Sequence, residues 1–115
     1  LPARDEFEVV YRNLKPTTEA NQTGSRPESG NHGDNANSVP AGSAYTTGDP
    51  ARTSALAFQD GGAEALDGTG DLYWTSTQYA PSTDYACIQR CSDGYQAPNG
   101  KDSSFLVRPV RRLKI

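Results

Sequence analysis

The clearest hydrophobic pattern lies at the start of the chain. Four apolar residues recur there at the spacing of one helix face, which predicts an α-helix over residues 4–14. They are Phe7, Val10, Tyr11 and Leu14. Acidic residues stand in the first turn, where they favour the positive end of the helix dipole, and Pro16 ends the helix. We expect this helix to be structural.

A second, shorter helix is predicted over residues 51–59. Asp49 and Pro50 are typical of an N-cap and a first helical position, and apolar residues follow as far as Phe58 before a glycine pair ends the segment. Between the two helices, residues 17–48 show no periodicity. That stretch is either a long loop laid over a scaffold or partly disordered.

The last third of the chain has the composition of strands. Residues 72–76 are rich in aromatic and β-branched side chains, which predicts a strand. Residues 85–91 are predicted as a second strand, and a Ser-Asp-Gly turn at residues 92–94 predicts a hairpin. We expect a further turn at Asn99-Gly100 and a closing strand over residues 105–110, irregular at its proline. Helices followed by a small antiparallel sheet indicate an α+β fold.

Length and charge narrow the classes of function. The 115 residues suffice for a single domain, residues 1–115. Because the chain has no methionine and opens at Leu1, we expect it to be the C-terminal part of a longer chain, with a trimmed chain as the alternative. A net charge of −3 provides no field for nucleic acid, and no apolar run reaches the ~20 residues that membrane insertion requires.

Three sequence blocks carry a resemblance to a known family. They are residues 1–7 (LPARDEF), 73–79 (YWTSTQY) and 107–111 (VRPVR), with FQDGGA at 58–63 between them. In this order the chain resembles the C-terminal domain of the Legionella collagen-like adhesin, and residues 11–17 and 111–115 are similar to the bacteriophage members. The resemblance implies a C-type-lectin-like fold in which two helices pack on a small antiparallel sheet with long loops.

Two cysteines depart from the family pattern. Cys87 and Cys91 stand where the family usually has aromatic core residues. On one strand they would lie about 13 Å apart, beyond the ~7 Å that a disulfide allows, so we expect free thiols. The formylglycine-generating enzymes share the broad fold and use paired cysteines, which leaves an oxidase pair as an enzymatic alternative. No activating base or metal ligand stands near this pair in the sequence.

The residues of common catalytic and metal sites are not arranged for chemistry. His32 is the one histidine, and we expect it to be a solvated loop residue without a serine partner. The aspartates are spread among turns and form no calcium-loop spacing. We therefore predict that the chain is not an enzyme and uses no cofactor or metal.

Ligand recognition is the class of function that remains. If Cys87, Gln89 and Cys91 point inward, the alternation of side chains along a strand turns Ile88, Arg90 and Ser92 outward. Three nearby loops could join that outward face. Tyrosine, serine and arginine suit an adaptable binding surface. The predicted ligand-binding residues are Ser82, Asp84, Tyr85, Ile88, Arg90, Ser92, Tyr95, Ser103, Ser104 and Phe105.

The resemblance places such a domain on a bacteriophage particle, at a tail fibre or another appendage. The expected partners are a host cell-surface protein or glycan and other virion proteins. One alternative is a structural decoration or assembly domain of the virion. Another is a bacterial cell-surface adhesin for sulfated polysaccharide, if a homotrimer gathers the basic residues of the C-terminal end into one patch. Those residues are Arg108, Arg111, Arg112 and Lys114.

The variable proteins of diversity-generating retroelements are a related group. Their variable sites derive from asparagine codons by adenine mutagenesis and cannot become Lys, Glu, Gln, Met or Trp. Within residues 79–106 only Gln89, Gln96 and Lys101 belong to that excluded set, so they would be fixed positions. The alternative is an ordinary polar region of loops and strands.

Overall fold

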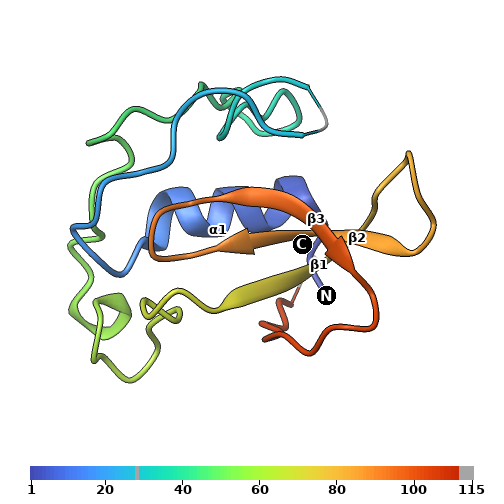
Figure 1. Cartoon of the computed structure of the whole chain (residues 1–115). Helices are drawn as coiled ribbons and strands as arrows, with labels where there is room; N and C mark the ends of the chain where they lie inside the picture. The colour runs from blue at the N-terminus through green and yellow to red at the C-terminus, as the bar shows by residue number, and fades with distance from the viewer. Residues whose placement is uncertain (28, 112–115) are drawn as a thin grey trace.

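The computed structural model describes residues 1–27 and 29–111. Its elements are helix α1 (Arg4–Leu14), the 3-10 turn η1 (Leu56–Phe58) and strands β1 (Leu72–Gln78), β2 (Tyr85–Arg90) and β3 (Gln96–Gly100). The strands form an antiparallel sheet in the order β1-β2-β3, and α1 packs against β1 and β2 (Figure 1). Over the described residues the protein is a small α+β structure.

Helix α1 confirms the prediction from the apolar stripe. The Glu6 carboxylate accepts a hydrogen bond from the backbone N–H of Ala3 at 2.9 Å, which satisfies one of the free donors at the helix start. Phe7 and Tyr11 are completely buried, and the other two stripe residues pack at the margin of the same cluster. The amphipathic face is therefore what fixes the helix on the sheet.

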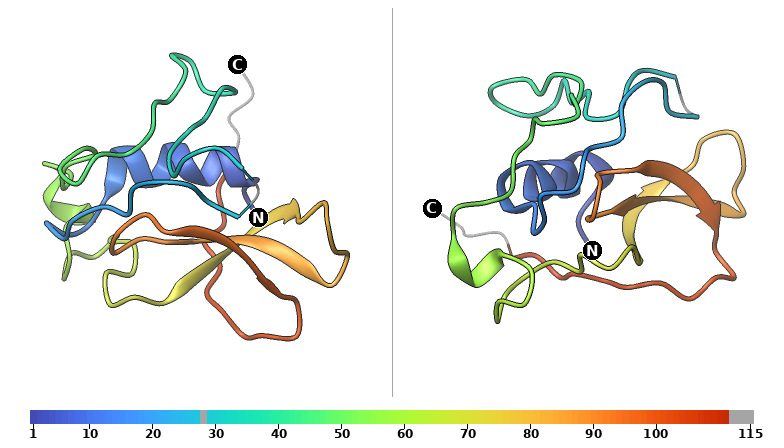
Figure 2. Two further views of the ribbon diagram at one scale, coloured as in Figure 1. Left: turned by 45° about the horizontal axis from the view of Figure 1, so that its top comes forward. Right: turned by 60° about the vertical axis from the view of Figure 1, so that its left-hand side comes forward.

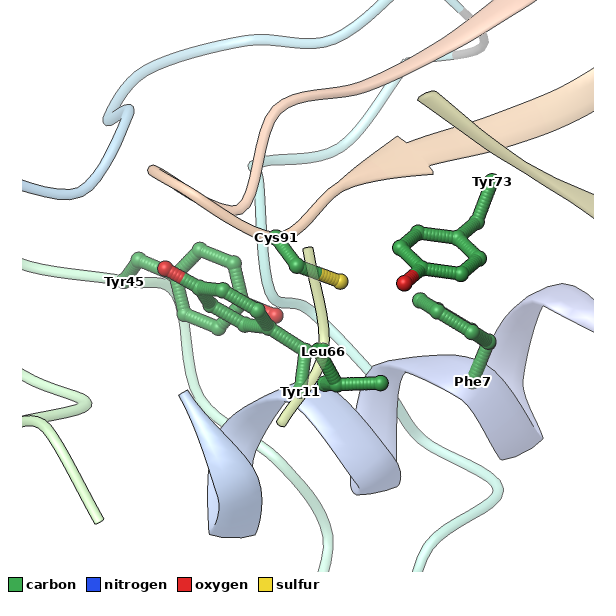
Figure 3. Packing of buried hydrophobic residues seen from close by; sticks show 6 residues of the cluster. All are labelled: Phe7, Tyr11, Tyr45, Leu66, Tyr73 and Cys91. Atoms are coloured by element: carbon green, nitrogen blue, oxygen red, sulfur yellow. The ribbon is translucent and has the colours of Figure 1, made fainter. Parts of the chain in front are cut away.

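The hydrophobic core is aromatic and small. Its buried members come from α1, from the loops and from the sheet, and Figure 3 shows them facing one another. The rings of Phe7 and Tyr73 lie 5.2 Å apart, and those of Tyr11 and Tyr45 lie 5.5 Å apart. Such tilted ring pairs stabilise beyond their buried area. The six residues of the cluster are Phe7, Tyr11, Tyr45, Leu66, Tyr73 and Cys91.

The predicted architecture, a C-type-lectin-like fold with two helices on the sheet, is wrong. The described residues contain one α-helix, and the segment expected as the second helix contributes only the three residues of η1. Leu56 is 78% exposed there and none of the three residues of η1 is fully buried, so the segment lacks the buried apolar stripe of a packed helix. A helix this short is not stable in water without such packing.

The third strand also differs from the prediction. Residues 96–100 form β3 and pair with β2, although their sequence suggests a turn at Asn99-Gly100. Pro98 is tolerated because β3 is an edge strand, where a missing backbone donor leaves no ladder bond unmade. The predicted closing strand over residues 105–110 is reduced to one parallel bridge between Leu106 and Tyr73. The hairpin between β2 and β3 is confirmed.

Residues 17–48 are laid over the scaffold, the first of the two predicted alternatives. The long loop passes beside α1 (Figure 2) and contacts both the helix and the sheet. Buried polar contacts attach it: the Tyr45 hydroxyl donates to Glu8 at 2.6 Å, and the Asn35 amide donates to the same carboxylate at 3.1 Å. Gln89 of β2 donates to the Tyr45 hydroxyl at 3.2 Å. One buried carboxylate thus joins helix, loop and sheet.

Candidate ligand-binding site

A surface depression lies at one end of the sheet. It has a volume of about 750 Å³, within the range of small-molecule sites. The turn between β1 and β2 forms one wall and the segment that follows β3 forms the other; Figure 1 shows both at its right-hand end. The lining residues are Thr83, Asp84, Tyr85, Asn99, Gly100, Lys101, Asp102 and Ser103.

Strand pairing fixes the two walls relative to each other. Tyr85 begins β2 opposite Gly100, which ends β3. Just beyond that pair the backbone N–H of Lys101 donates to the Asp84 carbonyl at 2.9 Å. Ser82 closes the other turn, because its carbonyl accepts the backbone N–H of Tyr85 at 3.3 Å. The pairing of β2 with β3 therefore holds the two walls together, although five of the eight lining residues lie in the turns beside the strands.

Gly100 forms the floor of the depression. A Cβ atom at this position would lie 2.8 Å from Oδ1 of Asp102 and 3.7 Å from the Tyr85 ring. The carboxylate and the aromatic ring therefore converge over one bare stretch of backbone. A side chain at position 100 would occupy the space that these two groups now share.

The polar groups of the depression are mostly unused within the protein. Among the described residues, the carboxylates of Asp84 and Asp102 have no hydrogen-bond or ion-pair partner. The Lys101 ammonium donates to the side chain of Gln78, on β1. Tyr85 is 44% exposed and its ring lies 6.4 Å from that of Tyr79. The site thus offers two free carboxylates beside an accessible aromatic ring.

Of the ten predicted binding residues, three line this depression. They are Asp84, Tyr85 and Ser103. Ser104 and Phe105 lie at a separate hollow with Asp71, where the Phe105 ring is 5.1 Å from that of Trp74. Ser82 supports the turn described above.

The remaining predicted residues lie elsewhere. Arg90 and Tyr95 lie at the hairpin of the opposite end of the sheet, where the guanidinium is 4.9 Å from the Tyr95 ring. Arg90 is also held by a bidentate pair with Asp93, at 2.9 and 2.8 Å. Ile88 and Ser92 are buried, at 0% and 4% exposure, so they cannot touch a ligand.

The prediction that Ile88 would contact a ligand failed because the side chains of β2 do not alternate between buried and exposed positions. Cys87, Ile88 and Gln89 follow one another and all three are buried, so both faces of this central strand are covered. The prediction assumed that only one face is covered. The side of the sheet that carries Ile88 and its partner Trp74 is covered in part by Phe105.

The predicted binding residues do not include five residues that line the depression: Thr83, Asn99, Gly100, Lys101 and Asp102. The signal that could have found them is the pairing of residues 85–90 with residues 96–100. A strand at 96–100 places Gly100 opposite Tyr85 and brings the following residues to the same end of the sheet. The proline and the Asn-Gly pair concealed that strand.

As predicted, Cys87 and Cys91 form no disulfide bond, and both side chains are buried. Burial raises the pKa of Cys91, and the nearby Asp67 carboxylate raises it further. A thiol in such a place stays protonated at neutral pH and is a poor nucleophile. The geometry therefore gives no support to the oxidase alternative.

His32 corrects another expectation. It is buried, at 4% exposure, and its Nδ1 accepts the backbone N–H of Gln96 at 3.3 Å. Its ring packs 5.7 Å from that of Tyr95. The histidine thus fastens the long loop to β3 and is not a solvated residue.

Among the described residues, no three His, Cys, Asp or Glu side chains gather closely enough to hold a metal ion. No helix there has the length and apolar character needed to cross a membrane. Arg112 and Lys114 of the predicted basic patch lie outside the described residues, while Arg108 is engaged by Glu64 at 3.7 Å.

No family model, curated protein or solved structure matches this chain.

Proposed function

We propose that this chain is a non-catalytic binding domain that recognises a polar ligand in the depression beside Tyr85. The observation that carries the proposal is that two carboxylates without a partner among the described residues, Asp84 and Asp102, line the same depression as the exposed ring of Tyr85. Exposed aromatic rings give contact area at low entropic cost, and fixed polar groups give specificity. Carboxylates beside an exposed aromatic ring are therefore suited to the recognition of a polar ligand.

The biological setting rests on the sequence resemblance. It favours a bacteriophage appendage, where the ligand would be part of a host cell surface. The same setting allows a decoration or assembly role within the virion, with contacts to other virion proteins only. The sulfated-polysaccharide alternative fits less well, because the carboxylates of the depression repel sulfate.

Retention on cells tests the proposal. Purified, labelled domain is mixed with a panel of bacterial strains, and the bound fraction is measured for the natural chain and for the double variant Asp84→Asn/Asp102→Asn. We expect at least one strain to retain the natural chain, and the double variant to bind about tenfold more weakly or worse, because hydrogen bonds to charged groups are among the stronger ones.

Asp71→Asn is the matched control, because Asp71 is an exposed carboxylate outside the depression. It should bind like the natural chain. No retention on any strain, combined with stable incorporation into particles, would favour the assembly role. Equal retention of the natural chain and the double variant would place binding elsewhere on the molecule.

A further inference from the structure

The peptide unit between Asn99 and Gly100 has a reactivity of its own. In such a unit the backbone nitrogen of the second residue can attack the side-chain amide carbon of the asparagine, which closes a succinimide ring and releases ammonia. Glycine hinders this attack least, because it has no side chain and adopts most backbone conformations without strain. Asn99 is the one asparagine in the sequence that precedes a glycine.

Strand pairing leaves the Gly100 nitrogen outside the hydrogen-bond ladder. The backbone N–H of the next residue, Lys101, donates to the Asp84 carbonyl at 2.9 Å. Hydrogen-bonded positions alternate along an antiparallel pair, so the N–H of Gly100 points to the free edge of β3. There it donates to Oδ1 of Asn99 at 2.8 Å. The attacking nitrogen therefore stands beside the carbonyl group that it attacks.

The position of this unit in the fold also permits the movement that attack requires. The peptide between Asn99 and Gly100 must turn out of its extended geometry. Gly100 is the last residue of β3, and β3 is an edge strand, so the turn disturbs only the end of the ladder. Both residues are half-buried, which leaves a path for the water that later opens the ring.

Two neighbouring side chains can assist the reaction. Oδ1 of Asp102 lies 2.8 Å from the position that a Cβ atom of Gly100 would take, so this carboxylate lies against the backbone of the glycine. It has no partner among the described residues and can accept the proton that the glycine nitrogen releases. The Ser103 hydroxyl donates to Oδ1 of Asn99 at 3.5 Å, where negative charge develops during the attack.

We propose that Asn99 is a self-modification site at which the folded chain converts asparagine to aspartate and isoaspartate, with Asp102 as the base. The Gly100 nitrogen loses its proton to the Asp102 carboxylate and forms a bond to Cγ of Asn99. The bond from Cγ to Nδ2 breaks, and Nδ2 takes up that proton and leaves as ammonia. Water then opens either C–N bond of the succinimide ring. The net change is the exchange of ammonia for water, and it needs no oxidant or cofactor.

The conversion alters the depression described above. Asn99 lines it together with Asp84 and Asp102, so the product adds a third carboxylate. Isoaspartate also adds a methylene group to the main chain near the end of β3, beside the pairing with Ala86. The conversion itself does not depend on the proposed function. Its effect on binding does, and the fresh and converted chains should then differ in affinity for a polar ligand.

Peptide mass spectrometry tests the modification directly. The full chain is kept folded in mildly alkaline buffer, and conversion at each asparagine is followed over time, with isoaspartate separated from aspartate by chromatography of the peptides. Asn37 is the internal control, because it is exposed, precedes serine and donates its amide to Asp5. We expect conversion at Asn99 to be at least about tenfold faster than at Asn37. Equal rates, or no conversion at Asn99, would overturn the proposal.

Variants assign the roles of the neighbouring side chains. Asp102→Ala should slow the conversion by about tenfold, less than an enclosed general base contributes, because Asp102 is exposed. Ser103→Ala should slow it less, since 3.5 Å is long for a hydrogen bond. Asp71→Ala is the matched control and should leave the rate unchanged, because Asp71 is an exposed carboxylate outside the depression. An unchanged rate in Asp102→Ala, or the same slowing when the chains are unfolded in urea, would overturn the role of Asp102 in the folded protein.

The cell assay separates this inference from the proposed function. Fresh and converted chains differ in charge, so ion exchange separates them, and each is then mixed with the same bacterial strains. A difference in retention supports both the conversion and the binding site. Conversion with no retention of either form overturns the proposed function and leaves the modification site standing. Equal retention of the two forms would contradict a ligand contact at Asn99.

Discussion

Arg90 and Asp93 show how a single residue pair secures the hairpin between β2 and β3. Burial opposes ionisation of Asp93, but hydrogen bonds from Arg90 and from the backbone of Tyr95, together with the guanidinium charge, outweigh it. The pKa of Asp93 is therefore held below its ordinary value. The same pairing raises the pKa of Arg90, chiefly through its hydrogen bond to Asp93.

This pair predicts a loss of stability in acid. A carboxylate with a depressed folded pKa stabilises the fold above its unfolded pKa, about 3.9, and that stability is lost as pH falls through the lower folded value. Asp93→Asn should cost about 1–3 kcal/mol at neutral pH, and less once the pH falls through the lowered pKa of Asp93. Urea unfolding between neutral and acidic pH measures both values. A deficit that stays constant with pH would contradict the assignment, and Asp71→Asn is the control without a partner.

At the scale of elements, the sequence predicted correctly the helix and the strand that the local pattern of side chains determines. The stripe from Phe7 to Leu14 gave α1, and the aromatic and β-branched run from Leu72 gave β1. The second helix failed because Leu56 has nothing to pack against, which no local signal reveals. Strand β3 was missed because its partner strand, and not its own composition, makes residues 96–100 extended.

Tyr45 carries the joint between α1, the long loop and β2. Its hydroxyl donates to Glu8 and accepts from Gln89, and burial raises its pKa, so it stays a neutral donor. Tyr45→Phe removes both hydrogen bonds. It leaves the Gln89 amide without a partner, because Oε1 of Gln89 already has none among the described residues.

We expect Tyr45→Phe to lower the free energy of unfolding by about 1–3 kcal/mol, the usual cost of leaving buried polar groups unpaired. Chemical denaturation measures this loss. Tyr79→Phe is the matched control, since the Tyr79 hydroxyl has no hydrogen bond in the described part of the chain, and it should change stability by less than about 0.5 kcal/mol. Equal effects in the two variants would show that the network adds nothing.

At the scale of the whole molecule, the packed core lies away from the candidate site. The aromatic core and the Glu8 network lie between helix and sheet, whereas the depression lies at one end of the sheet. Strand pairing at Tyr85 and Gly100 is the link between them. Side chains at the depression can therefore change with little cost to folding, as expected for function placed on exposed loops of a stable frame.

The hypothesis that a retroelement diversifies residues 79–106 stays a prediction. The burial of these residues agrees with it at some positions and conflicts with it at others. Gln89 and Gln96, which it treats as fixed, are buried at 0% and 1% exposure. Cys87 and Ile88, which it would allow to vary, are equally buried. Buried positions tolerate little change, because altered volume creates cavities or strain. Any diversified positions would therefore be confined to the exposed residues of the segment.

The location of the ligand tests the central claim most directly. A soluble extract from the surface of a retaining strain is titrated into isotopically labelled protein, and backbone amide chemical shifts are followed by NMR. We predict the largest shifts at Thr83, Tyr85 and residues 99–103, with α1 unmoved. Shifts confined to η1 or to residues 106–111, with the depression silent, would contradict the account.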